Sequence, residues 1–264
     1  MQPAPQPRTV QQLRAAIARI ERSGSHQPAE TLPFDVPEID AALPGGGLAT
    51  AALHEVVGTG IDLEFAAAPA LFAAGILARR PGPVLWVLER HDLFAPALAA
   101  SGLHPDRVIF AEAGRAALLV MEEGLQHKGM AGVVAEVSAR VSLTASRRLH
   151  LAAQAGGTIA LLLRRRDQAE GAIAAVTRWR IGPESSGPPV PHAPGIPGLG
   201  RLRWRLELMR CRGGRTGGWI MEACDAAGRL NLVSTLADGS AATSPEGALS
   251  GPRSAAIGRV HYAA

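Results

Sequence analysis

A glycine turn behind an apolar pair is the part of the sequence best placed to bind phosphate. Gly58 and Gly60 follow Val56–Val57 and precede the alanine-rich segment 66–78. A strand, a glycine turn and a helix in this order direct backbone N–H groups at phosphate oxygens. These two glycines are therefore the candidate nucleotide-binding residues of the chain.

The side chains that complete such a loop are missing. A Gly-x-x-x-x-Gly-Lys-Ser/Thr loop uses its lysine to reach the β- and γ-phosphates and its hydroxyl to hold magnesium. Here Ile61 and Asp62 follow Gly60, and the single lysine of the chain, Lys128, matches no such loop. The sequence predicts a nucleotide-binding scaffold that has lost the lysine and hydroxyl residue needed to bind and hydrolyse a nucleotide. We expect no bound cofactor, and weak ATP binding through backbone amides of the vestigial loop is left open.

Two carboxylates stand at or near the ends of apolar runs that read as buried strands. Glu89 follows segment 83–88, and Glu136 lies near the end of segment 132–137. A magnesium ion at Glu136 would need the loop hydroxyl and nucleotide oxygens as co-ligands. Both residues are better interpreted as strand-end residues, and no catalytic or metal-binding residue is assigned.

Three consecutive arginines, Arg164, Arg165 and Arg166, follow the predicted core strand 158–163. Adjacent cations at a strand end could hold a nucleic-acid backbone or an acidic partner. A solvated loop explains them equally well, so both interpretations stay open.

Two segments, 177–181 and 201–208, alternate between large apolar residues and arginine, which predicts two neighbouring edge strands with one buried face. The arginine face either protects a sheet edge or forms a basic binding stripe. Aromatic residues are missing from that face, so base stacking with single-stranded DNA lacks support. The candidate DNA- or partner-binding residues here are Arg178, Arg180, Arg203 and Arg205.

Composition fits one large α/β domain with tails. The chain has 264 residues, 47% of them hydrophobic, a mean hydropathy of +0.10 and a net charge of +4. No apolar run is long enough for a membrane span and no signal peptide is recognisable, so we expect a cytoplasmic protein. Two cysteines, Cys211 and Cys224, are too few for a disulfide framework. The positive charge permits nucleic-acid contact without demonstrating it.

The chain divides into a core and flanking segments. Residues 1–24 predict an amphipathic helix that packs on its own domain or docks on another subunit or partner. The core spans 25–236 and contains a Pro/Gly-rich loop at 182–200. Its start, Gly182–Gly187, spells part of a phosphate loop, but prolines replace the lysine and hydroxyl residue. Residues 237–264 predict a flexible tail.

Several passages carry a specific resemblance. The segment Phe34–Leu48, with Ile-Asp-Ala-Ala-Leu-Pro-Gly-Gly-Gly-Leu at its end, and the following Leu53–Gly58 resemble the approach to the phosphate loop in RecA and RadA cores. Together with 147–158 and Arg210–Trp219 they resemble more closely the ImuA family, RecA-like proteins of bacterial damage-induced mutagenesis operons. The resemblance implies an α/β fold: a RecA-like P-loop NTPase core with a mainly parallel sheet, helices on both faces and an antiparallel C-terminal extension.

The same resemblance implies the function. Proteins of this family act in SOS-induced, error-prone translesion DNA synthesis, and by analogy the chain is a non-catalytic accessory factor. The implied partners are a Y-family polymerase-like ImuB protein and an error-prone C-family DNA polymerase, with RecA and DNA as further candidates. Self-association and association with the nucleoid during activity are further expectations, and no membrane partner is expected.

Two other classes of protein stay as alternatives. A DNA-dependent ATPase or recombinase paralogue would use Glu89 to polarise water and Glu136 at the metal site, as RecA-like ATPases do, but the missing lysine counts against it. A SulA-like cell-division inhibitor shares a reduced RecA-like core. The long strands and the arginine triplet favour the mutagenesis interpretation over this one.

Overall fold

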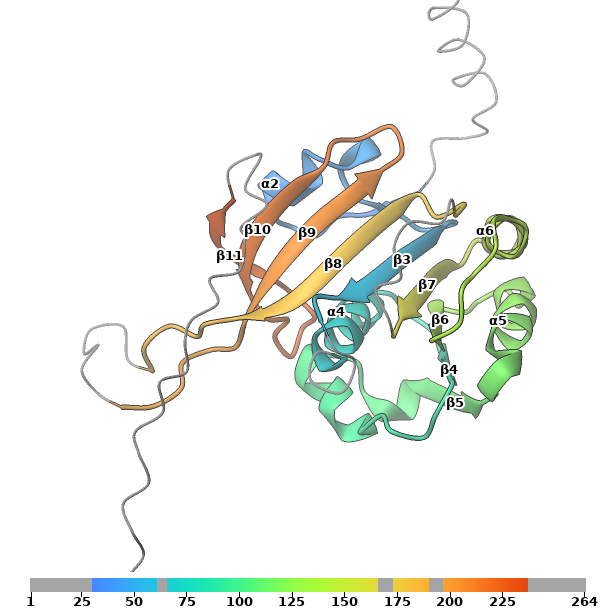
Figure 1. The fold of residues 1–264 in the computed structure, drawn as a ribbon, viewed down its shortest axis with the longest axis horizontal. Coiled ribbons are helices and arrows are strands. Elements are labelled where there is room, and N and C mark those ends of the chain that lie inside the picture. Colours follow the sequence, from blue (N-terminus) through green and yellow to red (C-terminus); the bar gives the residue numbers. More distant parts are fainter. Residues whose placement is uncertain (1–29, 61–65, 166–172, 190–196, 237–264) are drawn as a thin grey trace, which may run out of the picture.

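A computed structural model describes residues 30–60, 66–165, 173–189 and 197–236 (Figure 1). The predicted N-terminal helix within 1–24, Arg166 and the predicted tail 237–264 lie outside the described residues. Within the described part, no helix is long and apolar enough to cross a membrane.

The centre of the molecule is a nine-stranded sheet with the order β11-β10-β9-β8-β3-β7-β6-β4-β5. Six consecutive strands in this order are parallel. They are β8 (Thr177–Glu184), β3 (Leu53–Gly58), β7 (Ile159–Arg164), β6 (Gly132–Val137), β4 (Val84–Leu88) and β5 (Val108–Glu112). The mainly parallel sheet confirms the fold class predicted from the sequence.

An antiparallel extension follows β8, built from β9 (Arg203–Cys211), β10 (Gly217–Glu222) and β11 (Asn231–Thr235). The prediction that β8 and β9 are edge strands is wrong, because β8 lies between β3 and β9 while β9 lies between β8 and β10. The predicted loop also starts later than Gly182. β8 continues to Glu184, which is the register partner of Arg203.

Helices cover both faces of the parallel part (Figure 1). On one face, α4 (Ala67–Ala78) and the 3-10 helix η2 (Ala95–Ser101) pack into one apolar cluster. On the other face, α5 (Ala117–Gln126) and α6 (Leu143–Gly156) pack into a second. Ser142 begins α6 by accepting a hydrogen bond from the N–H of Ala145, and a left-handed glycine ends it.

The remaining elements are short and complete the frame. They are β1 (Thr31–Leu32), α2 (Pro37–Asp40), η1 (Pro44–Gly46), β2 (Leu48–Ala49), η3 (Pro105–Arg107) and η4 (Gly114–Ala116). β1 and β2 form a separate antiparallel pair ahead of β3.

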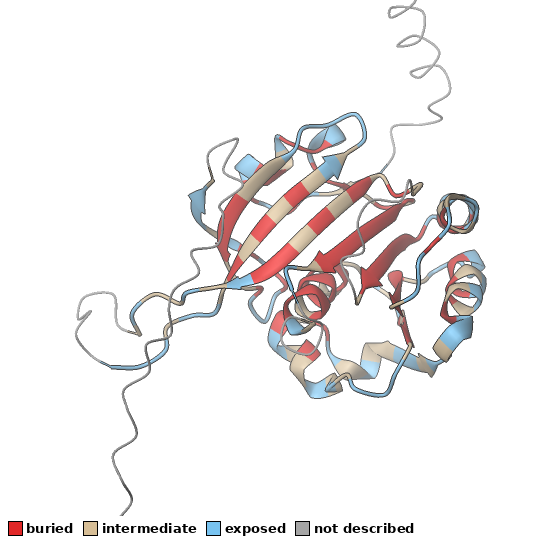
Figure 2. Ribbon diagram, viewed as in Figure 1, coloured by how far each residue is buried: buried red, intermediate tan, exposed pale blue. Residues whose placement is uncertain are grey.

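The predicted alternation of buried and polar residues is visible along β8 and β9 as bands of colour (Figure 2). Trp179 and Trp204 are buried on the inner face. The ring centroid of Trp179 lies 5.5 Å from that of Phe34 and 5.6 Å from that of Phe72. Burial of such aromatic rings stabilises the folded protein strongly, and their preferred packing angles fix how β8 sits against α4. The α4 face of the antiparallel strands is therefore part of the main core.

A buried polar chain joins β3 to β8. His54 is fully buried; its Nε2 lies 2.8 Å from the Ala49 carbonyl and its Nδ1 lies 2.7 Å from Thr177 Oγ1. Because a carbonyl only accepts, Nε2 carries the proton and Nδ1 accepts from the hydroxyl. The hydroxyl in turn accepts from Trp179 Nε1 at 2.9 Å. Burial lowers the pKa of His54 to about 4, so the ring is neutral.

Candidate functional site

The candidate site is a cleft at the carboxyl ends of the parallel strands, where open α/β sheets bind ligands. Its volume is about 1110 Å³. The cleft is lined by the glycine turn after β3, the first turn of α4, the segment after β4, and the ends of β6 and β7. Gly58 and Gly60, the candidate nucleotide-binding residues, both line this cleft.

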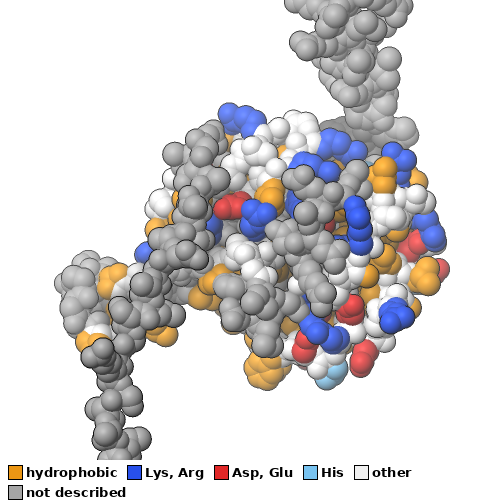
Figure 3. Space-filling model, viewed as in Figure 1, with side chains coloured by type: hydrophobic (Ala, Val, Ile, Leu, Met, Phe, Trp, Pro, Cys, Tyr) orange, Lys and Arg blue, Asp and Glu red, His pale blue; other side chains and the backbone are white. Residues whose placement is uncertain are grey.

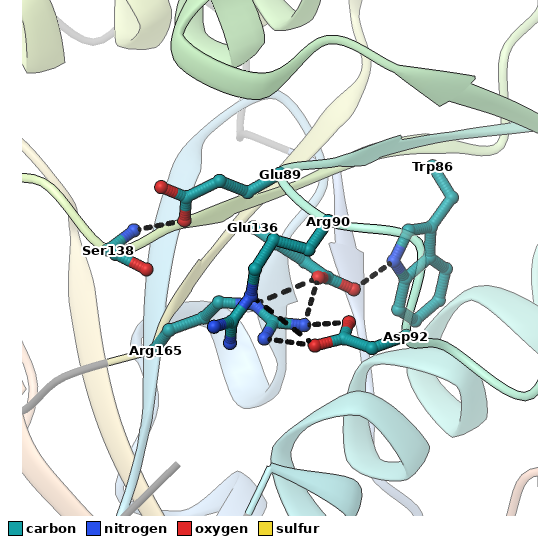
Figure 4. A network of polar contacts seen from close by, with 7 residues as sticks. All are labelled: Trp86, Glu89, Arg90, Asp92, Glu136, Ser138 and Arg165. Carbon is teal, nitrogen blue, oxygen red and sulfur yellow. Dashed lines mark hydrogen bonds and ion pairs between the residues drawn. The ribbon is translucent and has the colours of Figure 1, made fainter. Parts of the chain in front are cut away.

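Glu136 lies in this cleft at the end of β6 and is held by two side chains (Figure 4). Arg165 Nε and Nη2 lie 3.1 and 2.7 Å from Glu136 Oε2, and Trp86 Nε1 donates to Oε1 at 2.9 Å. Burial raises the pKa of the Glu136 carboxyl, while the bonds from Trp86 and Arg165 act in the opposite direction. Both carboxylate oxygens are therefore already engaged by protein donors.

Arg165 also binds Asp92, in the segment that follows β4. Arg165 Nη1 donates to Asp92 Oδ2 at 2.8 Å, and its Nη2 pairs with Oδ1. Arg90 Nε lies 3.4 Å from the same oxygen, Asp92 Oδ2. The guanidinium of Arg165 thus lies between two carboxylates, a position in which one cation compensates both charges.

Glu89 connects two strand ends. It directly follows β4, and its carboxylate accepts a hydrogen bond from the N–H of Ser138, which follows β6 (Figure 4). A residue in this position fixes the spacing between the two loops that border the cleft.

The glycine turn is closely packed by its neighbour strand. A Cβ on Gly182 of β8 would lie 2.3 Å from Thr59 Oγ1, so only glycine fits opposite the turn. The helix that follows, α4, begins at Ala67 with no side-chain cap. Lys128 lies between α5 and β6, before the amino end of a parallel strand, whereas the cleft is at the carboxyl ends. Among the described residues, no group of three or more His, Cys, Asp or Glu side chains could hold a metal ion.

The two described members of the predicted arginine triplet, Arg164 and Arg165, have buried side chains. The side chains of Arg164 and Arg165 are only 6% and 8% exposed. Arg164 Nε lies 3.8 Å from Glu55, whose other oxygen lies 3.4 Å from Arg178. The interpretation of these two residues as a solvated loop is therefore wrong. Both line the cleft, and the binding of a nucleic-acid backbone or an acidic partner by them stays a prediction.

The arginine face of β8 and β9 carries carboxylates as well. Arg180 pairs with Glu207 at 3.3 Å and Arg205 with Glu184 at 2.9 Å, while Arg203 lies opposite Glu184 in register. On the side of the molecule shown in Figure 3, acidic side chains lie beside basic ones at several places. Arg180–Glu207 and Arg205–Glu184 thus form a ladder of two cross-strand ion pairs on this face. Binding of DNA or a partner by its arginines stays a prediction.

The sequence interpretation missed Trp86, Asp92 and Glu55, which complete these ion-pair networks. One signal was available for Glu207, because it shares the alternating positions of Arg203 and Arg205 in β9. For Asp92 and Trp86, whose partners lie 73 and 50 residues away, the sequence offers no such local signal.

Comparison with known proteins decides the family. "Protein ImuA" of Caulobacter vibrioides, in strains NA1000 / CB15N and ATCC 19089 / CIP 103742 / CB 15, is 42% identical over an alignment of 243 residues. The match covers 85% of this chain and 98% of the relative. The chain belongs to the ImuA family. Membership ties it to damage-induced mutagenesis. No family model matches the chain.

A solved structure supports the fold of this ImuA family member independently. The crystal structure of the RadB recombinase superposes with a TM-score of 0.51 and 17% identity, covering 77% of this chain and all of the recombinase chain. At this level of identity the likeness concerns the fold alone. It confirms the RecA-like core that the sequence resemblance implied.

Proposed function

We propose that this protein is a non-catalytic accessory factor in SOS-induced, error-prone translesion DNA synthesis. It acts through contacts with a Y-family polymerase-like partner and an error-prone C-family polymerase, rather than through a reaction of its own. Family membership supports the biological process, and the engagement of Glu136 by Arg165 and Trp86 supports the lack of catalysis.

One observation carries the non-catalytic part of the proposal. Glu136, the carboxylate at the metal position of a RecA-like core, is occupied by Arg165 at 2.7 Å and by Trp86 at 2.9 Å. A magnesium ion there would have to displace the guanidinium, and no lysine is present in the glycine turn to attract the nucleotide. The acids of the site thus serve as internal ion-pair partners.

The direct test is ATP binding and hydrolysis by the purified protein, with and without single-stranded DNA. We expect neither binding at physiological ATP concentrations nor turnover. The variant Ile61→Lys/Asp62→Thr, which restores the missing loop chemistry, should also fail to hydrolyse ATP, because Arg165 still occupies Glu136. Rapid turnover in that variant would contradict this account of the site.

The partner contacts need a separate measurement. The purified protein should bind the Y-family polymerase-like partner without ATP, in a pull-down or by biolayer interferometry. Binding that requires nucleotide would instead indicate a nucleotide-driven switch.

A DNA-dependent ATPase is the second candidate, and the preserved cleft favours it. The cleft is large enough for a nucleotide, and Gly58 and Gly60 line it. DNA-stimulated hydrolysis that is lost in Glu89→Gln and Glu136→Gln would move the protein to this class.

A further inference from the structure

The two edges of the sheet differ in how they are protected. At one edge, β11 is mainly polar, and its pairing with β10 is interrupted by a register shift between Ile220 and Met221. At the other edge, β5 pairs with β4 through all five residues without a shift. Proteins normally protect an open edge with charge, proline or a bulge. β5 contains no lysine, arginine, proline or bulge, and its one charged residue, Glu112, is the last residue of the strand.

The β5 edge is also apolar on both faces. Ile109 is 55% exposed and Phe110 is 38% exposed, although both are large apolar side chains in the middle of a strand. Since side chains alternate along a strand, they project to opposite faces of the sheet. Neither face of β5 is therefore fully covered by the helices that cover the inner strands.

The hydrogen-bonding direction of β5 follows from its junction with β4. Ala113 donates its N–H to the Leu88 carbonyl at 3.0 Å, so this position points toward β4. Because the direction alternates along a strand, the N–H and C=O groups of Val108, Phe110 and Glu112 point outward. The Val108 N–H already donates to the Pro105 carbonyl. The outward groups of β5 are thus the carbonyl of Val108 and both backbone groups of Phe110 and Glu112, which another extended strand can pair with.

From these observations we propose that β5 pairs antiparallel with β5 of a second copy across a two-fold axis. Among such two-fold registers, one pairs all three outward residues: Phe110 opposite Phe110, with Val108 opposite Glu112 on each side. In this register Val108 takes part through its carbonyl, which accepts from the Glu112 N–H of the second copy. This register places Ile109 opposite the small Ala111 and keeps the two Glu112 carboxylates at opposite ends of the pair. The pairing joins two nine-stranded sheets into one and removes both open β5 edges.

A second copy fits this edge better than an unrelated strand because the sequence of β5 complements itself. The aromatic residue meets its own copy at the axis, the large residue meets the small one, and like charges are separated. A two-fold contact also closes after two copies, so the apolar edge does not propagate into a fibre. The interface is small, and the dimer is therefore expected to depend on concentration.

Site-specific crosslinking tests the register. In a Cys211→Ser background, Phe110→Cys brings two thiols together at the axis, where opposed Cα atoms lie about 5.5 Å apart, within the range of a disulfide. Mild oxidation should yield a covalent dimer of twice the 27.4 kDa chain mass. Two variants serve as matched controls. In Ile109→Cys the Cα atoms of the two copies lie about 8 Å apart in this register, and Leu119→Cys places a thiol at an exposed position outside β5. Equal crosslinking of all three variants would refute the register.

Sedimentation over a concentration series tests the dimer itself. The wild-type protein should show a concentration-dependent dimer, Phe110→Lys should be a monomer with an unchanged circular dichroism spectrum, and Leu119→Lys should still dimerise. Deleting residues 1–24 should leave the dimer intact. A wild-type protein that is monomeric at every concentration would overturn the proposal, as would a dimer that survives Phe110→Lys or disappears with the N-terminal segment.

Discussion

Arginine and glutamate are paired in two regions of this molecule, and the two regions differ in burial. At the cleft, the side chains of Arg165 and Glu136 are 8% and 5% exposed. On the open face of β8 and β9, those of Arg205 and Glu184 are 31% and 28% exposed. The chemistry is the same in both, so the difference isolates the effect of solvent.

Burial determines what each pair can do. A buried ion that loses its partner remains in a medium of low dielectric, and the cost of that state is high. A half-exposed ion that loses its partner is rehydrated, and its pairing is worth little. The cleft network is therefore expected to fix local structure, while the ladder mainly protects solubility and register.

The largest effect should come from Arg165→Met. This change leaves Glu136 buried without a cation, and we expect the free energy of unfolding to fall by about 3–5 kcal/mol. Urea unfolding followed by circular dichroism measures it. The double variant Arg165→Met/Glu136→Gln should recover much of the loss, because the neutral amide can still accept from Trp86. A loss below about 1 kcal/mol in the single variant would mean that water reaches the network.

His54 is buried like the ion pair in the cleft, but its ring is neutral. The pKa of His54 is about 4 in the folded protein and about 6.5 in the unfolded chain. Between these values the unfolded state binds a proton and the folded state does not. The free energy of unfolding should therefore fall as the pH is lowered from 6.5 to 4, by about 3 kcal/mol in total from this residue.

The variant His54→Gln isolates the contribution of this residue, because carboxylates and His150 titrate alike in both proteins. Urea midpoints measured at several pH values between 4 and 7 should fall less steeply toward acid in the variant than in the wild type. Parallel pH profiles for the two proteins would show that His54 takes up its proton without unfolding the chain.

The sequence predicted the frame of the cleft but not its ion pairs. Local patterns placed β3, the glycine turn and α4 correctly, since apolar runs and glycine positions are properties of neighbouring residues. The arginine triplet misled because consecutive residues of an extended chain point in opposite directions. Arg164 pairs with Glu55 and Arg165 with Glu136 and Asp92, so the two cations never form one patch.

The ion pairs of β8 and β9 show a second feature that the sequence could not predict. Alternation in β8 and β9 correctly predicted which face is buried, but edge position depends on strands that come later in the chain. β8 lies between β3 and β9, and the later strand β10 pairs with β9 and makes it an interior strand as well. Pair formation with Glu184 and Glu207 then depends on cross-strand register, which the long connection between the strands leaves unspecified.

The smallest effect should come from the ladder. A double-mutant cycle on Arg205→Met and Glu184→Gln should give a coupling of less than about 1 kcal/mol, since both side chains remain in contact with water. Raising the salt concentration from 0.05 to about 0.5 M should reduce this coupling further, while the effect of Arg165→Met stays nearly constant because buried pairs are screened much less. Urea unfolding at the two salt concentrations measures both. A coupling at the ladder as large as that at the cleft would show that this face is shielded from solvent, and the open face of β8 and β9 would then have to be treated as a covered surface.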